Sequence, residues 1–555
     1  MITFLKKYNF SLLVILSFVV WFASYSKVPF IFFQQDELMG FGLFILKGVN
    51  MLYTGFGFKD MVHFVPVTMS LSFSLFNLFG LNPIPYNIIG LIFHTVNGLL
   101  IYLLGQKIFK NKVYSLISLI LFLSSSAGAE LVMWPVINLN TISLTFALLA
   151  IHIQISAYIK NGLPKTYEYV YISLFFLLAV FSVEYAAGMI FIIPVVGYIM
   201  DRKNKGIKKL KNQWPFYATV VGYLLFRFLP VVFLKQSTSL DSVVATGITE
   251  RLVSLIRLPF VYLSQLFLGQ TLLIDISQFI SNVFYNNTAN TQFAEGVLFK
   301  YVAIFAGILI VLLFTKIIVK VDGLFQKYLL IFLFFIILSS LPFALVPGQT
   351  FSIISSRYLY FGAVGYAFLL VLVLKLVVKL QNKKHILIYT LFLILMIFSE
   401  VRGNYEKGNL LYKTGMTRIN ILNSIKTSYP ELPKKVVFYT QSNKSYYGLA
   451  DDDKILPFQS GLGQTLYLWY YSDEKFSKNF FKEEFLWGIL SEGYKSEGEQ
   501  GFGYFRNYEN LKVAVIANKL KPESVIAFKW DANSETLTDI TEEIRIKLKN
   551  EIKFK

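Results

Sequence analysis

Cysteine is absent from the 555-residue sequence, and histidine occurs only four times. The missing cysteines exclude disulfides, thiolate catalysis and cysteine-ligated metals. The histidines are scattered, without the spacing of a metal site. A Walker loop, a GxGxxG after a strand and a GxSxG are also missing. The sequence therefore gives no support for the common nucleotide-binding, zinc or serine-hydrolase chemistries.

Charge is also scarce. Only 15% of the residues are charged, whereas ordinary globular proteins carry roughly a quarter. Hydrophobic residues make up 55% of the chain and the mean hydropathy is +0.56. Apolar runs long enough to cross a hydrocarbon layer of about 30 Å recur from residue 9 to about residue 400. The composition indicates an integral membrane protein whose first partner is the lipid bilayer.

The net charge of +19 does not point to nucleic acid, because lysine and arginine sit mainly in short loops between apolar runs. Such loops set the orientation of membrane helices, with the basic loops inside. On this rule the inner loops hold Lys107, Lys110, Lys112, Lys160, Lys165 and the basic run 202–211. No nucleic-acid partner is expected.

The expected architecture is an all-α polytopic membrane bundle of about eleven transmembrane helices, with a small C-terminal extracytoplasmic α/β domain. Residues 1–401 form the bundle and residues 402–555 the soluble domain. The expected spans are 9–27, 85–105, 113–129, 136–158, 168–184, 186–200, 215–234, 297–316, 328–346, 358–376 and 385–401. The first is interpreted as a retained helix rather than a cleaved signal peptide. The expected location is the cell (plasma) membrane, as a multi-pass protein.

Two long outer loops contain apolar stretches interrupted by polar residues, at 63–80 and 248–269. Both are interpreted as helices that lie in the membrane interface. If either one spans, the parity of the spans changes, and with it the side of the C-terminal domain.

The soluble region has alternating and periodic patterns. The sequences KKVVFYT, KVAVIA at 512–517 and SVIAFKWD predict strands, and ITEEIRIKLKNEIK predicts a terminal helix.

Carboxylates close to the hydrocarbon layer are energetically costly, so their presence there suggests a functional role. Four carboxylates of this sequence are candidates for chemistry. Asp36 and Glu37 form an adjacent pair after the first span, where one could act as a general base while a neighbour holds the other. A hydrated loop is the alternative. Glu130 and Glu184 lie at the outer ends of predicted spans, either lining a cavity or making helix-end contacts.

Basic and aromatic residues at the same face complete the candidates. Arg357, followed by Tyr358, suits the phosphate of a lipid head group, or is an interfacial anchor. His63 and Lys59, at the end of the first outer loop, are grouped with the substrate-binding residues, although a lone histidine at such a place is often structural.

In combination these motifs resemble the multi-spanning GT-C glycosyltransferases, most closely the protein O-mannosyltransferase-like branch. An acidic pair in the first outer loop is followed by matches at Pro66, Gly80, Pro83, His94 and Asn97. The segments LVMWPVINLNTIS, FSVEYAAGM and SSRYLYFGAVGY are similar to further family motifs, in order, over residues 10–400. Val65 and Tyr86 depart from the pattern, where the family often has Arg and His.

The resemblance implies transfer of a sugar from a polyprenyl-phosphate carrier to a protein, lipid or glycan acceptor on the outer face. Asp36 would be the catalytic base and Glu37 would support it. Arg357 would bind the carrier phosphate, and Glu130 and Glu184 would line the cavity. Some GT-C enzymes also use a divalent metal held by such carboxylates; the sequence leaves the metal open.

Two other classes stay open from the sequence. A transporter or flippase of lipid-linked saccharides is one, although inverted repeats and broken helices, which are frequent in transporters, are not evident. A non-catalytic binding or assembly protein is the other, with the outer domain as its working part. Within the enzymes, a polysaccharide polymerase or ligase with a similar topology also stays open.

Overall fold

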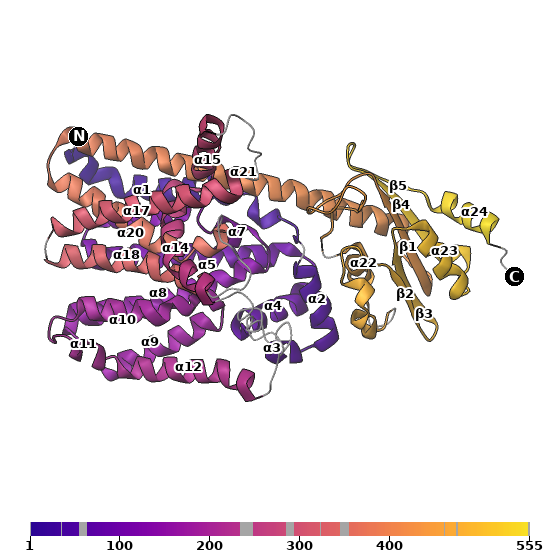
Figure 1. Ribbon diagram of the computed structural model, residues 1–555, viewed down its shortest axis with the longest axis horizontal. Helices are drawn as coiled ribbons and strands as arrows, with labels where there is room; N and C mark the ends of the chain where they lie inside the picture. The colour runs from indigo at the N-terminus through magenta and orange to yellow at the C-terminus, as the bar shows by residue number, and fades with distance from the viewer. Residues whose placement is uncertain are drawn as a thin grey trace. The chain divides into compact units, whose positions relative to one another are not determined.

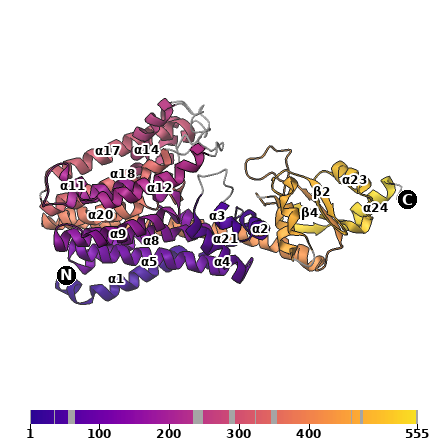
Figure 2. The same ribbon diagram turned by 90° about the horizontal axis from the view of Figure 1, so that it is seen from below.

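The computed structural model describes residues 2–34, 36–54, 64–233, 248–284, 294–321, 323–344, 354–459, 461–472 and 476–552. The described chain is mostly helical, with a five-stranded sheet near the C-terminus (Figures 1 and 2). It divides into two compact units. The first comprises Met1–Pro29, Leu52–Ser72 and Tyr86–Asn409, and the second Phe30–Met51, Phe73–Pro85 and Leu410–Lys555.

The first unit is a helical bundle. Helix α8 packs against α9 and α10, and α18 packs against α10, α14 and α20 (Figure 1). The helices that contribute to this unit are α1 (Ile2–Tyr25), α5 (Pro83–Phe109), α6 (Lys112–Ser124), α7 (Ala129–Met133), η3 (Ile137–Asn140), α8 (Thr141–Asn161), α9 (Thr166–Val180), η4 (Glu184–Gly188), α10 (Met189–Met200), α11 (Lys208–Lys211), α12 (Trp214–Phe233), α14 (Ile248–Leu268), α15 (Gln270–Phe284), η5 (Ala294–Leu298), α17 (Phe299–Val319), α18 (Gly323–Ala344), α19 (Ser356–Leu359), α20 (Gly362–Lys379) and α21 (Lys383–Ser428).

Six helices among the described residues are long and apolar enough to cross a membrane, or seven if a bent pair counts as one span. They are Pro83–Phe109, Ile137–Asn161, Gly296–Val319, Gly323–Phe343, Gly362–Lys379 and Lys383–Ser428. Eleven spans are not confirmed, because several expected runs form shorter helices. Helices α6, α9 and α10 have 13, 15 and 12 residues, whereas about 20 are needed to span. The apolar helices agree with a multi-pass membrane protein.

Helix α14, which covers the stretch expected at 248–269 to lie in the membrane interface, packs against α17 and α18. Leu258, Tyr262 and Leu266 recur every four residues and are buried along one face, which is the pattern of a helix packed in a core. The contact with α17 is close: a Cβ added at Gly307 would lie 2.1 Å from the Phe260 carbonyl oxygen. After Gly269 the chain bends by 104° into α15.

The second unit is built on a sheet with strand order β2-β3-β1-β4-β5. Strands β3, β1 and β4 are parallel, and β2 and β5 are antiparallel edge strands. Figure 1 shows α22 on one side of the sheet and α23 and α24 on the other. The bounds are β1 (Lys435–Ser442), α22 (Leu462–Tyr470), η6 (Lys478–Lys482), η7 (Glu484–Leu486), β2 (Gly493–Glu497), β3 (Gln500–Phe505), α23 (Tyr508–Ala517), η8 (Pro522–Ser524), β4 (Val525–Asp531), β5 (Thr536–Asp539) and α24 (Thr541–Glu551).

Strands β1 and β4 and helix α24 confirm three of the four elements predicted in this region. The strand predicted at 512–517 is wrong, because these residues belong to α23. Asn507 caps this helix by accepting the backbone N–H groups of Glu509 and Asn510. Leu511 and Val515, four residues apart, are its buried positions. The cap and the helical spacing outweigh the short alternating pattern.

The second unit also contains residues that the division at residue 401 assigned to the bundle. The segment Phe30–Met51 belongs to this unit. It contains α2 (Asp36–Lys47), which packs against α22 and η6. The short helices η1 (Val28–Phe30) and α3 (Asn50–Thr54) lie at its two ends. Gln464 Nε2 donates to the Leu38 carbonyl over 2.7 Å. Helix α4 (Pro66–Phe79) contributes Phe76, whose ring stacks on Phe41 at 4.8 Å.

Candidate functional site

The acidic pair lies at the start of α2, in the second unit. Glu37 is 4% exposed, and its Oε1 accepts the Gln34 backbone N–H over 3.1 Å. A carboxylate near the start of a helix that accepts the backbone N–H three residues upstream makes a capping contact. Glu37 therefore helps to fix the start of the helix that carries Asp36.

Three of the predicted residues have no described side chain: the Asp36 side chain, Lys59 and His63 lie outside the described residues. The others belong to the first unit: Glu130, Glu184, Arg357 and Tyr358. The candidate site is built from this second set and its neighbours.

Glu130 and the serines before Arg357 form one hydrogen-bonded cluster. The Ser355 hydroxyl donates to Glu130 Oε2, and the Glu130 backbone N–H donates to Ser356 Oγ over 3.1 Å. Lys407 Nζ reaches Ser356 Oγ at 3.5 Å. Helix α7 and the start of α19 are thus joined by contacts that place a carboxylate and an ammonium beside the same serine pair.

Arg357 lies beside two aromatic rings. Its Cζ is 4.9 Å from the centroid of the Tyr358 ring and 5.8 Å from that of Trp134. Its Nη2 donates to the Tyr358 hydroxyl at 3.2 Å. Aromatic faces attract a guanidinium without using its N–H donors, so the ring contacts leave the Nε–H group for another partner.

Three buried donors in this region have no hydrogen-bond partner among the described residues. They are Arg357 Nε, Trp134 Nε1 and the Tyr185 hydroxyl. Buried polar groups are satisfied in the great majority of native structures, so an unsatisfied group needs an explanation such as a ligand. The guanidinium's own Nε–H and two neighbouring donors point to an acceptor-rich ligand.

Glu184 is linked to this region by the next residue in the chain, Tyr185. Glu184 begins η4, and the ring of Tyr185 meets the ring of Tyr358 edge-on at 6.0 Å. The Tyr185 ring also contacts Phe343 at 5.7 Å, and Phe343 contacts Tyr358 at 4.6 Å. These rings form an apolar wall beside the arginine.

His94 and Asn97, two residues that carry the family resemblance, contact the segment that follows Arg357. His94 Nδ1 lies 2.9 Å from the Tyr360 hydroxyl, and Asn97 Nδ2 donates to the same oxygen at 3.0 Å. Asn97 Oδ1 in turn accepts from the Thr145 hydroxyl at 2.7 Å. Tyr360 is three residues beyond Arg357, so α5 fixes the position of the arginine segment.

The close packing continues at Gly128, the residue before α7. Its φ is +102°, and a Cβ there would lie 2.2 Å from Tyr360 Cδ2. Only glycine accommodates both this backbone conformation and this contact. From the other side, the Tyr262 hydroxyl of α14 donates to the Tyr358 carbonyl over 2.7 Å.

Sequence reasoning missed Lys407, because the last span was expected to end at residue 401. Helix α21 continues to Ser428, and one of its faces is polar. Glu400 accepts the Ser126 backbone N–H, and Asn404 Nδ2 donates to the Ser124 carbonyl over 2.8 Å. The spacing of Glu400, Asn404 and Lys407 places them on one helical face, and that spacing was a readable signal.

The described residues contain no group of three or more His, Asp or Glu side chains that could hold a metal ion. What they offer is a guanidinium and an ammonium, two serine hydroxyls, unsatisfied donors and aromatic walls. A planar guanidinium with free N–H groups binds phosphate or carboxylate oxygens in pairs. Comparison with known proteins gave no relative: neither a protein-family model nor a curated protein matches this chain.

Proposed function

We propose that this protein is a membrane glycosyltransferase that moves a sugar from a polyprenyl-phosphate carrier to an acceptor on the outer face of the membrane. One observation carries the proposal: the Arg357 guanidinium lies beside the Tyr358 and Trp134 rings, and its buried Nε has no hydrogen-bond partner in the described part of the chain. A phosphate ester would supply acceptor oxygens to this nitrogen and to Trp134 Nε1, neither of which has a partner among the residues that the structure describes.

In the proposed reaction the acceptor oxygen attacks the anomeric carbon, and the bond from that carbon to the phosphate oxygen breaks. The electron pair stays on the carrier phosphate, whose negative charge grows. Arg357 and Lys407 stabilise that charge electrostatically. The resemblance to GT-C enzymes gives the role of the base, which takes the acceptor proton, to Asp36.

Purified protein in proteoliposomes tests the proposal. The donors are polyprenyl-phosphate sugars labelled in the sugar, offered as a panel with peptide, lipid and glycan acceptors. We expect labelled acceptor with the wild type and at least a hundredfold loss with Arg357→Gln, since one stabilising donor is worth about that much. Arg357→Lys keeps the charge without the fork and should retain part of the activity. Arg402→Gln is the matched control, since Arg402 is exposed and pairs with Glu406.

A transporter of lipid-linked saccharides is the second candidate, because the same site would bind the same lipid head group. In that case labelled lipid crosses the bilayer while no sugar reaches an acceptor. That outcome, dependent on Arg357, would replace the transferase.

A further inference from the structure

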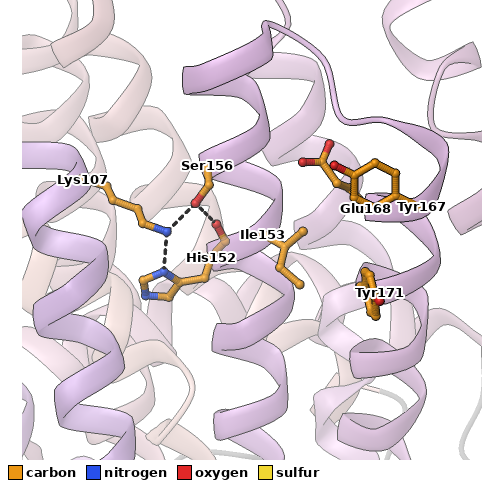
Figure 3. Close-up of a pocket in the computed structure, with 7 residues that line it drawn as sticks. All are labelled: Lys107, His152, Ile153, Ser156, Tyr167, Glu168 and Tyr171. Carbon is orange, nitrogen blue, oxygen red and sulfur yellow. Dashed lines mark hydrogen bonds between the residues drawn. The ribbon is translucent and has the colours of Figure 1, made fainter.

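A pocket lies in the first unit, at the end of α8 remote from Trp134. It has a volume of about 320 Å³ and is lined by Lys107, His152, Ile153, Ser156, Tyr167, Glu168 and Tyr171 (Figure 3). Helix α8 begins at Thr141, near Trp134, and Ser156 follows 15 residues later. At 1.5 Å per residue the two sites are separated by roughly 20 Å along the helix.

Lys107 supplies the positive charge of this pocket. Its Nζ contacts His152 Nδ1 at 3.1 Å and also donates to the Ser156 hydroxyl. No Asp or Glu side chain of the described chain lies within ion-pair distance of it. An ammonium carries three N–H donors, so one donor is not used by these two contacts.

His152 contributes no charge of its own here. Its Nε2 lies 2.7 Å from the Leu100 carbonyl oxygen, which can only accept. The proton is therefore on Nε2, and Nδ1 accepts from Lys107. His152 and Ser156 thus orient the ammonium without neutralising it (Figure 3).

The acidic residue of the pocket is engaged elsewhere. Glu168 Oε2 accepts the Lys165 backbone N–H at 2.6 Å, which caps α9. In Figure 3 its carboxylate stands on the α9 side, with the Ile153 face of α8 between it and Lys107. Glu168 therefore does not act as the counter-ion of Lys107.

The remaining wall suits a lipid. Tyr167 and Tyr171, one helical turn apart on α9, are 55% and 52% exposed. Exposed tyrosines of this kind are typical of the level of the lipid head groups. Nearby residues are basic: Lys160 lies in the last turn of α8, and Lys203 Nζ donates to the Asn161 carbonyl. Basic residues mark the cytoplasmic side, where anionic lipids concentrate.

We propose that this pocket binds the phosphate of an anionic phospholipid head group. Lys107 would donate to the phosphate oxygens, and the two tyrosines would contact the glycerol region. The proposal does not depend on the glycosyltransferase assignment, because it concerns a different site and a bound lipid rather than a reaction.

Native mass spectrometry of the detergent-purified full-length protein tests it. The protein is titrated with phosphatidylglycerol, with zwitterionic phosphatidylcholine and with soluble glycerol 3-phosphate. We expect saturable binding that favours phosphatidylglycerol, with a dissociation constant about fivefold higher in Lys107→Gln. Lys521→Gln, which removes an exposed lysine of the second unit, should leave the constant unchanged.

Tyr171→Ala provides an independent variant at an exposed position, and we expect it to weaken phosphatidylglycerol binding as well. If Lys107→Gln unfolds, Tyr171→Ala still decides the case. Equal binding in wild type and both variants would overturn the proposal. Equal affinity for the two lipids would also overturn it, and full competition by glycerol 3-phosphate would replace the lipid with a soluble phosphate ester.

Discussion

Arg418 Nη1 donates to Gln34 Oε1 over 3.2 Å, although the two residues are 384 positions apart in the chain. The Arg418 side chain is 4% exposed and also bonds the carbonyls of Phe33 and Pro457. Gln34 is the residue whose N–H is accepted by Glu37. A single buried arginine of α21 thus holds the segment that leads into the acidic pair.

Replacing Arg418 should loosen α2. Arg418→Gln leaves buried carbonyl oxygens without a donor, which costs on the order of 2 kcal/mol. Amide hydrogen exchange of the Asp36–Lys47 peptide should become roughly thirtyfold faster. Arg402→Gln on the same helix removes only an exposed ion pair and should leave that exchange unchanged. Unaltered exchange in Arg418→Gln would show that other contacts hold α2.

The two acidic residues should differ in their effect on sugar transfer. Asp36→Asn removes the base that the proposed reaction requires, so transfer should fall by about a hundredfold or more. Glu37→Gln keeps a carbonyl oxygen to accept the Gln34 N–H, so transfer should stay within about threefold. Both variants are assayed with the labelled donor panel, after a thermal unfolding measurement has shown that they unfold at the wild-type temperature. The reverse order of effects would make Glu37 the base.

The second unit should lose stability in alkali. Burial raises the pKa of Tyr504 to about 12, from an ordinary value of 10.0. The folded state therefore favours the neutral phenol. Its contribution, about 2.7 kcal/mol for a shift of two pH units, is fully present below pH 10 and is lost as the pH rises from 10 to 12.

Urea titrations at pH 9 and pH 11 check this expectation. Protease cleavage within the second unit reports the urea concentration at which that unit unfolds. Tyr504→Phe should be less stable at pH 9, because Thr440 loses a hydrogen-bond partner at 3.0 Å, but should lose less stability between the two pH values. Tyr447→Phe, at an exposed tyrosine of the same unit, should behave as the wild type does. A wild-type protein equally stable at both pH values would contradict the expectation.

Gly307→Ala should destabilise the bundle, because the new methyl group would overlap the Phe260 carbonyl of α14. Overpacking of this kind typically costs about 1–3 kcal/mol, and it should lower the thermal unfolding temperature in detergent by several degrees. Gly222→Ala is the matched control, since a Cβ at Gly222 meets nothing within 4 Å. If both variants unfold at the wild-type temperature, α14 and α17 are not held at this distance.

Local patterns predicted those parts of the fold that depend on neighbouring residues. The strands at 435–442 and 525–531 and the helix at 541–551 agree with their sequence periods. The strand expected at 512–517 is wrong because Asn507, five residues earlier, caps a helix. The expected count of eleven spans rested on hydropathy, which does not report that a run such as Lys112–Ser124 stops after 13 residues.

The candidate site was predictable as separate motifs and not as a constellation. Glu130 and Arg357 each stood out by charge near an apolar run, and the structure joins them through Ser355 and Ser356. Lys407 was missed because hydropathy falls after residue 401 while the helix continues. Arg418 gave no signal, because its burial comes from a segment almost four hundred residues upstream.

The partners of the α2 segment have a consequence for the order of synthesis. Gln464 and its acceptor Leu38 are 426 residues apart, and a ribosome adds roughly 5–20 residues per second. The acidic segment is therefore made some 20 to 85 seconds before the residue that fastens it. During that interval the helices after it are made, and the hydrogen bond between Leu38 and Gln464 cannot yet form. A chain that ends before Arg418 therefore lacks the hydrogen bonds that Arg418 and Gln464 make to this segment and keeps only its contacts with earlier residues, such as that of Phe41 with Phe76.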